Sequence, residues 1–144
     1  LLIYRLGQSF GRSEAERILP QLNLEGLAER IAAGPIWAAY SGFVRVRLLP
    51  GSVLEPNENY FLFYEHPKNF EAQFWKGSGR TATEPVCFFN AGYSAGWCSV
   101  ASGVDLDAEE ILCEARGDSA CRFIMFPSER RMEYMERVDE FKSL

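Results

Sequence analysis

The sequence predicts one domain in which helices and β-strands are mixed. Three observations indicate this. Apolar residues recur at helical spacing in the first third of the chain and again after residue 85, β-branched and aromatic residues gather in its middle, and a turn-forming stretch near residue 117 separates two short apolar runs. The chain has 144 residues, of which 47% are hydrophobic, which is enough to bury a core.

The first third of the chain is predicted to be helical. Leu1 to Phe10 suits a buried helix, which Gly11 is expected to break. A second, short helix should end near Leu19-Pro20, because a proline disfavours helix in the residue before it. Leu24 to Ala33 has another helical period, and Gly34-Pro35 is expected to stop it.

The middle of the chain is predicted to form strands. Ile36 to Leu49 is rich in β-branched and aromatic residues that alternate toward its end, and Asn59 to His66 has the same character. Lys68 to Lys76 is predicted to be a short helix.

Pro85 to Ser102 has the strongest helical pattern, with Pro85 in the first turn. Small residues fall along it at spacings of four, three and four, at Gly92, Gly96, Ser99 and Gly103. Glycine weakens a helix by about 1 kcal/mol per site, so this ridge indicates that another backbone packs closely against it.

The last third of the chain is predicted to contain a hairpin and a helix. Asp107 to Glu114 and Ala120 to Phe126 form the hairpin around residues 116–119. Ser128 to Ser143 is predicted to be an amphipathic helix with one apolar side, made of Met132, Met135, Val138 and Phe141. We therefore divide the chain into a domain at 1–127 and a C-terminal helix at 128–144, which packs on the domain or leads into a following one.

Cysteines and a glutamate near the hairpin are candidate metal ligands. Cys113 and Cys121 are centred on Gly117, so an antiparallel hairpin brings them close together. Glu110 lies three residues before Cys113, and residues three apart on an ideal strand face opposite sides. A bulge or an irregular strand end must therefore turn Glu110 toward the sulfurs.

The helix at 85–102 contributes two further cysteines. Cys87 lies at its start, where backbone N–H groups stabilise a thiolate. Cys98 is about 16 Å farther along the axis, so only one of the two can share an ion with the hairpin. By spacing alone, a zinc site, plain buried thiols and a Cys113–Cys121 disulfide all remain open.

Aromatic residues make up 14% of the chain and could form core or line a cavity for a flat apolar ligand. The candidate lining residues are Trp37, Tyr40, Tyr64, His66 and Trp97. His66 is the only histidine and is the candidate polar anchor.

Several function classes are disfavoured. The net charge is −5 without a basic run, which argues against direct contact with nucleic acid. No apolar run is long enough for a membrane span and no signal peptide is visible, so we expect a cytoplasmic protein with metal-bound or free thiols. Dinucleotide and phosphate-binding motifs and a Ser/His/Asp order are missing, so we do not expect an enzyme.

The motifs of the second half resemble the 4-vinyl reductase domain family, especially the effector-sensing domains of XylR/DmpR-type regulators, which respond to aromatic compounds. The matching elements are P-V-C at residues 85–87, G-Y-S-A-G-W at 92–97, E-x-x-C at 110–113 and G-x-x-x-C-R at 117–122. The segments GPIWAAYSGFVRV and NFEAQFW match more loosely, and the likeness covers most of residues 1–127.

The resemblance implies an α+β, Bet3-like fold, with an antiparallel sheet packed with helices, usually in a homodimer. It implies a structural zinc that clamps the C-terminal hairpin through Cys87, Glu110, Cys113 and Cys121. Cys87, rather than Cys98, is therefore the expected ligand.

The resemblance also implies a sensory domain that binds a small apolar, aromatic effector and acts on an output domain outside this chain. The phenol sensors hold the ligand hydroxyl with a histidine that is Ala38 here, and their pocket tryptophan falls at His66. We therefore expect a retained pocket with a moved polar anchor, and not phenol itself as the ligand. The alternatives are a thiol-based redox or zinc switch and a tetrapyrrole-related reductase.

Overall fold

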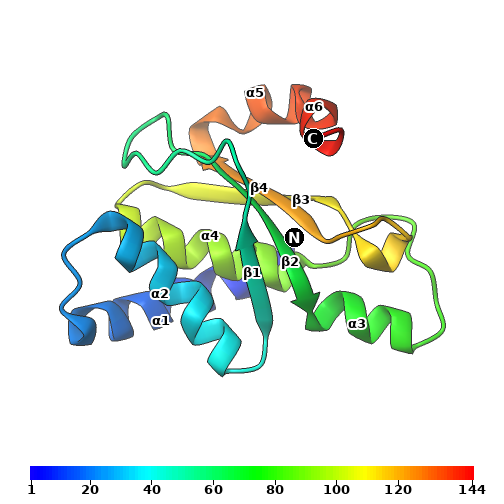
Figure 1. Cartoon of the computed structure of the whole chain (residues 1–144), viewed down its shortest axis with the longest axis horizontal. Coiled ribbons are helices and arrows are strands. Elements are labelled where there is room, and N and C mark those ends of the chain that lie inside the picture. The colour runs from blue at the N-terminus through cyan, green and yellow to red at the C-terminus, as the bar shows by residue number, and fades with distance from the viewer.

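A four-stranded antiparallel sheet carries helices on both of its faces (Figure 1). The computed structural model describes residues 1–144. The strands run in the order β1-β2-β4-β3, with β1 at Val44–Leu48, β2 at Leu62–Asn69, β3 at Leu106–Leu112 and β4 at Arg122–Pro127. The predicted mixture of helices with an antiparallel sheet is thereby confirmed.

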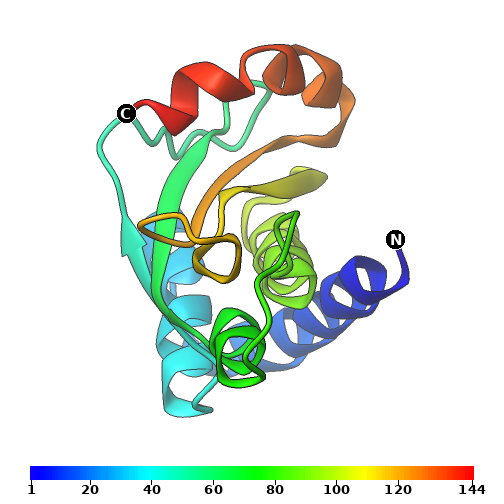
Figure 2. The ribbon, with the colours of Figure 1, turned by 90° about the vertical axis from the view of Figure 1, so that its right-hand side faces the viewer.

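Each face of the sheet has its own helical cover (Figure 2). On one face, α4 (Phe88–Ser102) packs on β3, α2 (Leu27–Tyr40) packs on β1 and α4, and α1 (Leu2–Leu22) packs on α4. The other face carries η2 (Ser128–Arg130), α5 (Arg131–Glu136) and α6 (Val138–Lys142). Helix α3 (Phe70–Gly77) lies beside η1 (Glu114–Arg116) at one end. None of the helices combines the length and apolar character needed to cross a bilayer.

Helix α1 is one continuous helix, so the prediction of two short helices in residues 1–20 is wrong. Gly11 does not break α1, because its missing side chain is what allows α4 to approach. Pro20 lies in the last turn, where the loss of one backbone hydrogen bond is tolerated. The helix ends at Asn23, whose φ of 50° is left-handed.

Helix α2 continues through Gly34-Pro35 to Tyr40, so the predicted stop at this pair and the predicted strand from Ile36 are both wrong. Only Val44–Leu48 is extended. A tertiary contact explains the difference, since the backbone of Gly34 lies directly against the indole of Trp97. A Cβ at Gly34 would be 2.7 Å from Trp97 Cδ1. Packing on α4 thus outweighs the local cost of the proline.

Helices α1 and α4 cross with their backbones in direct contact. Ideal Cβ atoms at Gly7 and Gly11 would lie 2.2 Å from carbonyl oxygens of α4. Those at Gly92 and Gly96 would lie 2.1 Å from carbonyl oxygens of α1. The predicted close approach to the helix is therefore confirmed at two of its four small residues. Ser99 instead hydrogen-bonds Ala95 and Leu106, and Gly103 ends the helix at a φ of 77°.

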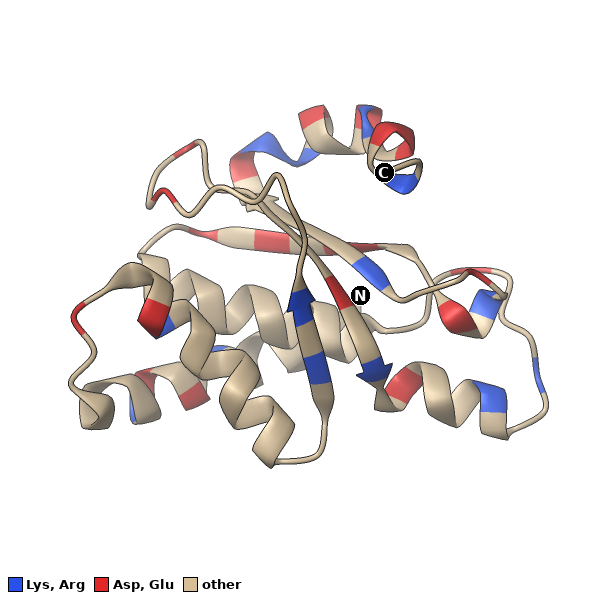
Figure 3. Ribbon diagram, in the orientation of Figure 1, with Lys and Arg blue, Asp and Glu red and all other residues tan.

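Helix α4 begins at Phe88, three residues later than predicted, with Cys87 as the capping residue. It carries no charged side chain along its length (Figure 3). A carboxylate from α3 satisfies its first turn instead. Glu71 accepts hydrogen bonds at 2.9 Å from the backbone N–H groups of both Phe89 and Asn90. An acidic group at this position also complements the helix dipole.

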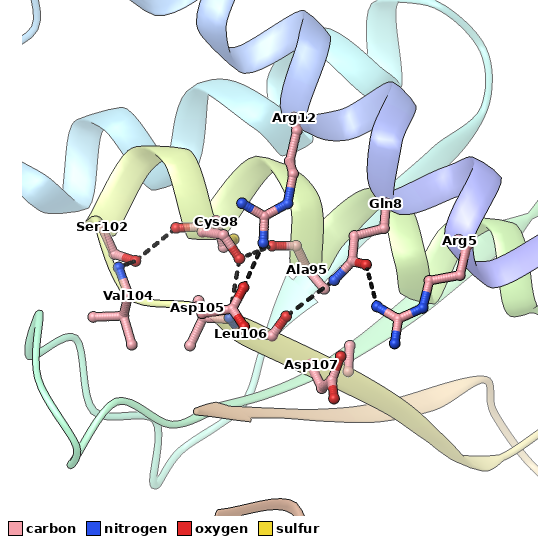
Figure 4. A network of polar contacts seen from close by, with 12 residues as sticks. Arg5, Gln8, Arg12, Ala95, Cys98, Ser102, Val104, Asp105, Leu106 and Asp107 are labelled. Carbon is pink, nitrogen blue, oxygen red and sulfur yellow. Dashed lines mark hydrogen bonds and ion pairs between the residues drawn. The ribbon is translucent and has the colours of Figure 1, made fainter. Parts of the chain in front are cut away.

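Polar side chains fasten α1 to the segment that leads into β3 (Figure 4). Arg12 pairs with Asp105 at 2.5 Å, and the Gln8 amide donates to the Leu106 carbonyl at 3.4 Å. The Tyr4 hydroxyl accepts from Ala108 N at 3.0 Å. These bonds hold β3 in place beneath the two crossed helices.

The C-terminal segment is three short pieces and not the single helix predicted. It packs on the sheet through Tyr134 and Phe141, which join Phe63 and Phe126 in a second apolar cluster. Tyr134 stacks on Phe126 with ring centroids 4.8 Å apart. Met132, predicted on the apolar side, is 75% exposed. The turn at Arg137 breaks the helical period, so one stripe cannot face the sheet throughout.

Candidate metal centre and ligand cavity

The structure brings together the four residues predicted as metal ligands. Cys87 precedes α4, Glu110 lies on β3, and Cys113 and Cys121 flank the turn between β3 and β4. One ligand atom from each lies within 4.8 Å of all the others, and all four residues are buried. The sulfurs are free thiols, with Cys87 Sγ and Cys121 Sγ 3.9 Å apart.

A β-bulge aims Glu110 at the sulfurs. Glu110 pairs with Phe123 on β4, but Leu112 pairs with the adjacent Arg122, so the register shifts at Ile111. The extra residue breaks the strict alternation of strand side chains and lets Glu110 and Cys113 face the same point. This is the irregularity that the spacing of the two residues requires.

The turn between β3 and β4 is shaped by its own hydrogen bonds. The Asp118 carboxylate accepts from Cys113 N at 2.8 Å, and Gly117 adopts a φ of 102° that favours glycine. Glu114 N donates to Cys121 Sγ at 3.5 Å. Backbone N–H groups directed at sulfur stabilise its thiolate form.

The cluster has more acidic groups than its surroundings neutralise. Glu110 Oε2 accepts from Cys87 N at 2.8 Å, whereas Oε1 is buried without a hydrogen-bond partner. Burial raises the pKa of Glu110 to about 8. Hydrogen bonds from the thiols of Cys121 and Cys87 lower the pKa of Cys113 to about 2, while the bond to Cys113 raises the pKa of Cys87. One thiolate shared among three sulfurs is thus favoured, and further ionisation needs a cation.

A metal ion fits this group. In a tetrahedral site with metal–sulfur bonds of about 2.3 Å, two sulfurs lie about 3.8 Å apart. The separation of Cys87 Sγ and Cys121 Sγ, 3.9 Å, matches this value. The unpartnered Glu110 Oε1 supplies a fourth, oxygen ligand. The buried group of three cysteines and one glutamate could therefore hold a metal ion.

A small cavity reaches the cluster from α1. It has a volume of about 260 Å³, and its wall includes Cys87 and Glu110 together with Tyr4, Arg5 and Arg131. The edge of the cluster formed by Cys87 and Glu110 therefore borders a space that small molecules could enter.

A larger cavity of about 430 Å³ lies between α2, β1, β2 and α4. Fifteen of its 18 lining residues are hydrophobic, and none is charged. Because a charged group loses its hydration in such a space, the cavity suits a neutral apolar molecule.

Two of the five predicted pocket residues, Tyr64 and Trp97, line this cavity. Trp37 and Tyr40 do not, and they are 38% and 89% exposed. Both lie in the last turn of α2, which we predicted as a strand, and being three apart they share a helix face directed away from the cavity. The guanidinium of Arg17 covers the Trp37 ring at 6.0 Å instead.

His66 is buried but does not line the cavity. Its ring lies 4.3 Å from that of Phe123, and Nδ1 is 3.2 Å from the Asn69 amide nitrogen. Burial lowers the pKa of His66 to about 3, so the ring is neutral. The Asn69 carbonyl oxygen in turn accepts from the Asn90 amide at 2.9 Å. His66 thus belongs to a buried polar network between the cavity and the metal cluster.

Several lining residues were missed by the sequence prediction. Helix α2 contributes residues at helical spacing: Ala28, Ile31, Ala32, Pro35, Ile36 and Ala38. Their period is visible in the sequence, but only if the helix is extended through Gly34-Pro35. Ser94 and Cys98 on α4 also lie on the wall. Both fall on the α4 face opposite the glycine contact, a signal that needs the position of α1 to interpret.

The fold and the two sites define an α+β domain with a buried metal-ligand cluster beside an apolar cavity. Residues 71–127 match the 4-vinyl reductase domain, which confirms the resemblance to this family. The chain is 29% identical over 123 residues to the transcriptional regulatory protein XylR of Pseudomonas putida. That match covers 83% of this chain but 21% of XylR, so the chain spans about a fifth of its curated relative.

Two solved structures have the same fold. The phenol-responsive sensory domain of the transcription activator PoxR, bound to phenol, superimposes with a TM-score of 0.77 at 23% identity, over 99% of this chain and 69% of that one. A vinyl-4-reductase family protein from Methanocaldococcus jannaschii gives a TM-score of 0.56 at 17% identity, over 87% of this chain and 67% of that one.

Proposed function

We propose that this chain is the ligand-binding sensory domain of a transcriptional or signalling regulator, and that it binds a small apolar, aromatic effector. The observation that carries the proposal is the cavity of about 430 Å³ with 15 hydrophobic and no charged residues among the 18 that line it. The names of XylR, a transcriptional regulatory protein, and of the phenol-responsive PoxR domain support the regulatory role and the aromatic ligand.

A structural zinc ion is the second part of the proposal. Cys87, Glu110, Cys113 and Cys121 would hold it, and the fold would then be a Bet3-like fold with a zinc-clamped hairpin. The ion would supply the positive charge that this acidic cluster lacks. Four protein ligands leave no open position for a catalytic water, which favours a structural and not an enzymatic role. The ion would tie the start of α4 to the turn between β3 and β4.

The third part concerns the parts of the regulator outside this chain. We propose that residues 1–127 form the sensor and that residues 128–144 lead toward an output domain, in a cytoplasmic homodimer. The chain's span of 21% of XylR supports a sensor that is one part of a longer protein. To transmit a signal, the effector must bind two conformations with different affinities.

Filling the cavity tests the effector site. Ala38 is buried on the cavity wall, whereas its neighbour Ala39 is exposed and outside it. We expect Ala38→Phe to weaken the binding of bicyclic aromatic probes, measured by calorimetry, by about 10-fold or more, because the new ring occupies the space of the ligand. Ala39→Phe should bind like the wild type. Equal affinity in both variants would refute the assignment of the site.

A thiol switch is the alternative function, favoured by one observation. The cavity of about 260 Å³ borders Cys87, and Cys121 Sγ lies 3.9 Å from Cys87 Sγ. Peroxide could oxidise these two thiols to a disulfide, with the peroxide reduced to water and zinc released. Rapid peroxide-dependent zinc release, followed with a chromogenic chelator, would favour the switch over a purely structural ion.

A further inference from the structure

The hydroxyl of Tyr64 is a polar group left unsatisfied in an apolar cavity wall. Tyr64 lies on β2 and is 2% exposed, and its ring stacks on Phe123 with centroids 5.3 Å apart. The stacked ring fixes the direction of the hydroxyl, which is buried and makes no hydrogen bond. Burying a hydroxyl without a partner is unfavourable, so this position calls for one.

The other large polar side chains of the wall already have partners. Trp97 Nε1 donates to the Arg30 carbonyl at 3.1 Å, and the Tyr93 hydroxyl donates to Glu14 Oε2 at 2.9 Å. Both bonds point out of the cavity, toward α2 and α1. Ser94 lies near Tyr64 and is the one partly exposed residue between Asn90 and Ser99 on α4. The free polar groups of the wall are therefore concentrated at Tyr64.

The Tyr64 hydroxyl is a permanent neutral donor. Burial raises the pKa of Tyr64 well above its usual value, so the phenol does not ionise at physiological pH. With no charged residue among the 18 that line the cavity, a carboxylate or an ammonium group would find no counter-charge there.

We infer that Tyr64 is the polar anchor of the cavity and that its hydroxyl donates a hydrogen bond to a single oxygen atom of a neutral ligand. The inference rests on the proposed sensory function and names its ligand class. An engineered apolar cavity of about 150 Å³ holds one benzene molecule. A cavity of about 430 Å³ therefore has room for a body larger than one ring. The class is a bicyclic or alkyl-substituted aromatic compound with one carbonyl, ether or hydroxyl oxygen.

Matched ligands and matched variants test the anchor. Indane and indanone have nearly the same shape and differ by one carbonyl oxygen. Tyr60 is the matched control residue, because its hydroxyl is also buried and without a partner but does not line the cavity. Affinities of the 144-residue chain for indane, indanone and an indane carboxylate are measured by calorimetry at neutral pH.

The wild type is expected to bind indanone about 10-fold more tightly than indane, which corresponds to about 1.4 kcal/mol. Tyr64→Phe should bind the two with affinities within about twofold of each other, since only the hydroxyl is removed. Tyr60→Phe should keep the full preference for indanone, and the carboxylate should not bind to any variant.

The outcomes separate the inference from the function on which it rests. If the wild type binds both neutral probes equally, or if Tyr64→Phe keeps the preference, Tyr64 is not the anchor and the sensory function still stands. If none of the probes binds to the folded wild type, the proposed function fails and the inference fails with it.

Discussion

At the scale of single residues, the cluster of Cys87, Glu110, Cys113 and Cys121 shows how much depends on one extra residue in a strand. The bulge at Ile111 places a carboxylate and a thiol on the same side of β3, where a regular strand would separate them. The result is an acidic, buried group with one unpartnered oxygen. Its geometry suits a cation better than it suits protonated ligands.

Removing one sulfur should remove the metal. We expect Cys113→Ser to lose its zinc, from about one ion per chain to almost none, and to melt at a lower temperature, because bound zinc stabilises the folded state. Elemental analysis and thermal melts measure both effects. Cys98→Ser is the control, since Cys98 is buried on the cavity wall and lies outside the cluster. Equal metal content in the two variants would exclude this site.

A second comparison at this scale concerns β2. Tyr64 and His66 are two residues apart and face the same side of the sheet, and both are buried. Only Tyr64 lines the cavity, whereas His66 is surrounded by Phe123 and Asn69. A distance of two residues along one strand therefore decides which polar group a ligand can meet.

At the scale of elements, the contact between α1 and α4 determines the helical layer. Gly7, Gly11, Gly92 and Gly96 allow the two backbones to touch, and this contact explains why a glycine-containing helix is retained in the core. It also explains why α1 passes through Gly11 without a break. The loss of helix propensity at these glycines is outweighed by the close approach they permit.

A single methyl group should disrupt this contact. A Cβ at Gly96 would lie 2.1 Å from the carbonyl oxygen of Gln8, which belongs to backbone and cannot move away. We expect Gly96→Ala to lower the free energy of unfolding by about 3 kcal/mol, measured by urea denaturation. Gly77→Ala, at a helical glycine with open space around it, should change that free energy by less than about 1 kcal/mol. A mild effect at Gly96 would contradict the helix contact described.

At the scale of the whole molecule, the sheet separates two apolar clusters. The larger one lies toward α4 and includes the cavity wall, and the smaller one is covered by the C-terminal segment. A change on one face can reach the other only through the sheet. The C-terminal segment is thus placed where it could respond to the strands that border the cavity.

Truncation tests the contribution of this segment. A chain of residues 1–127 would lack Tyr134 and Phe141 and would expose Phe63, Ile124 and Phe126. We expect it to lose about 5 kcal/mol or more of stability and to bind a hydrophobic dye, because burying one such aromatic ring contributes about 3–5 kcal/mol. A chain that ends at Lys142 removes only exposed residues and should melt like the full chain. Equal melting of all three chains would show that the segment does not stabilise the domain.

The sequence by itself determined the type of each major pattern and the chemistry of the metal-ligand group. The helical periods, the strands at Val44–Leu48 and Leu62–Asn69, the hairpin around Gly117 and the spacing of Glu110, Cys113 and Cys121 are local properties. They depend on side-chain period and turn residues, which any window of the chain displays.

Only the tertiary structure decided where helices end and which side chains meet the cavity. Helix α2 passes Gly34-Pro35 because Trp97, far away in the sequence, packs on Gly34. This same extension turns Trp37 and Tyr40 outward and leaves Tyr64 on the wall. Contacts between distant segments contribute more free energy than the local preferences of proline and glycine, and no local pattern records them.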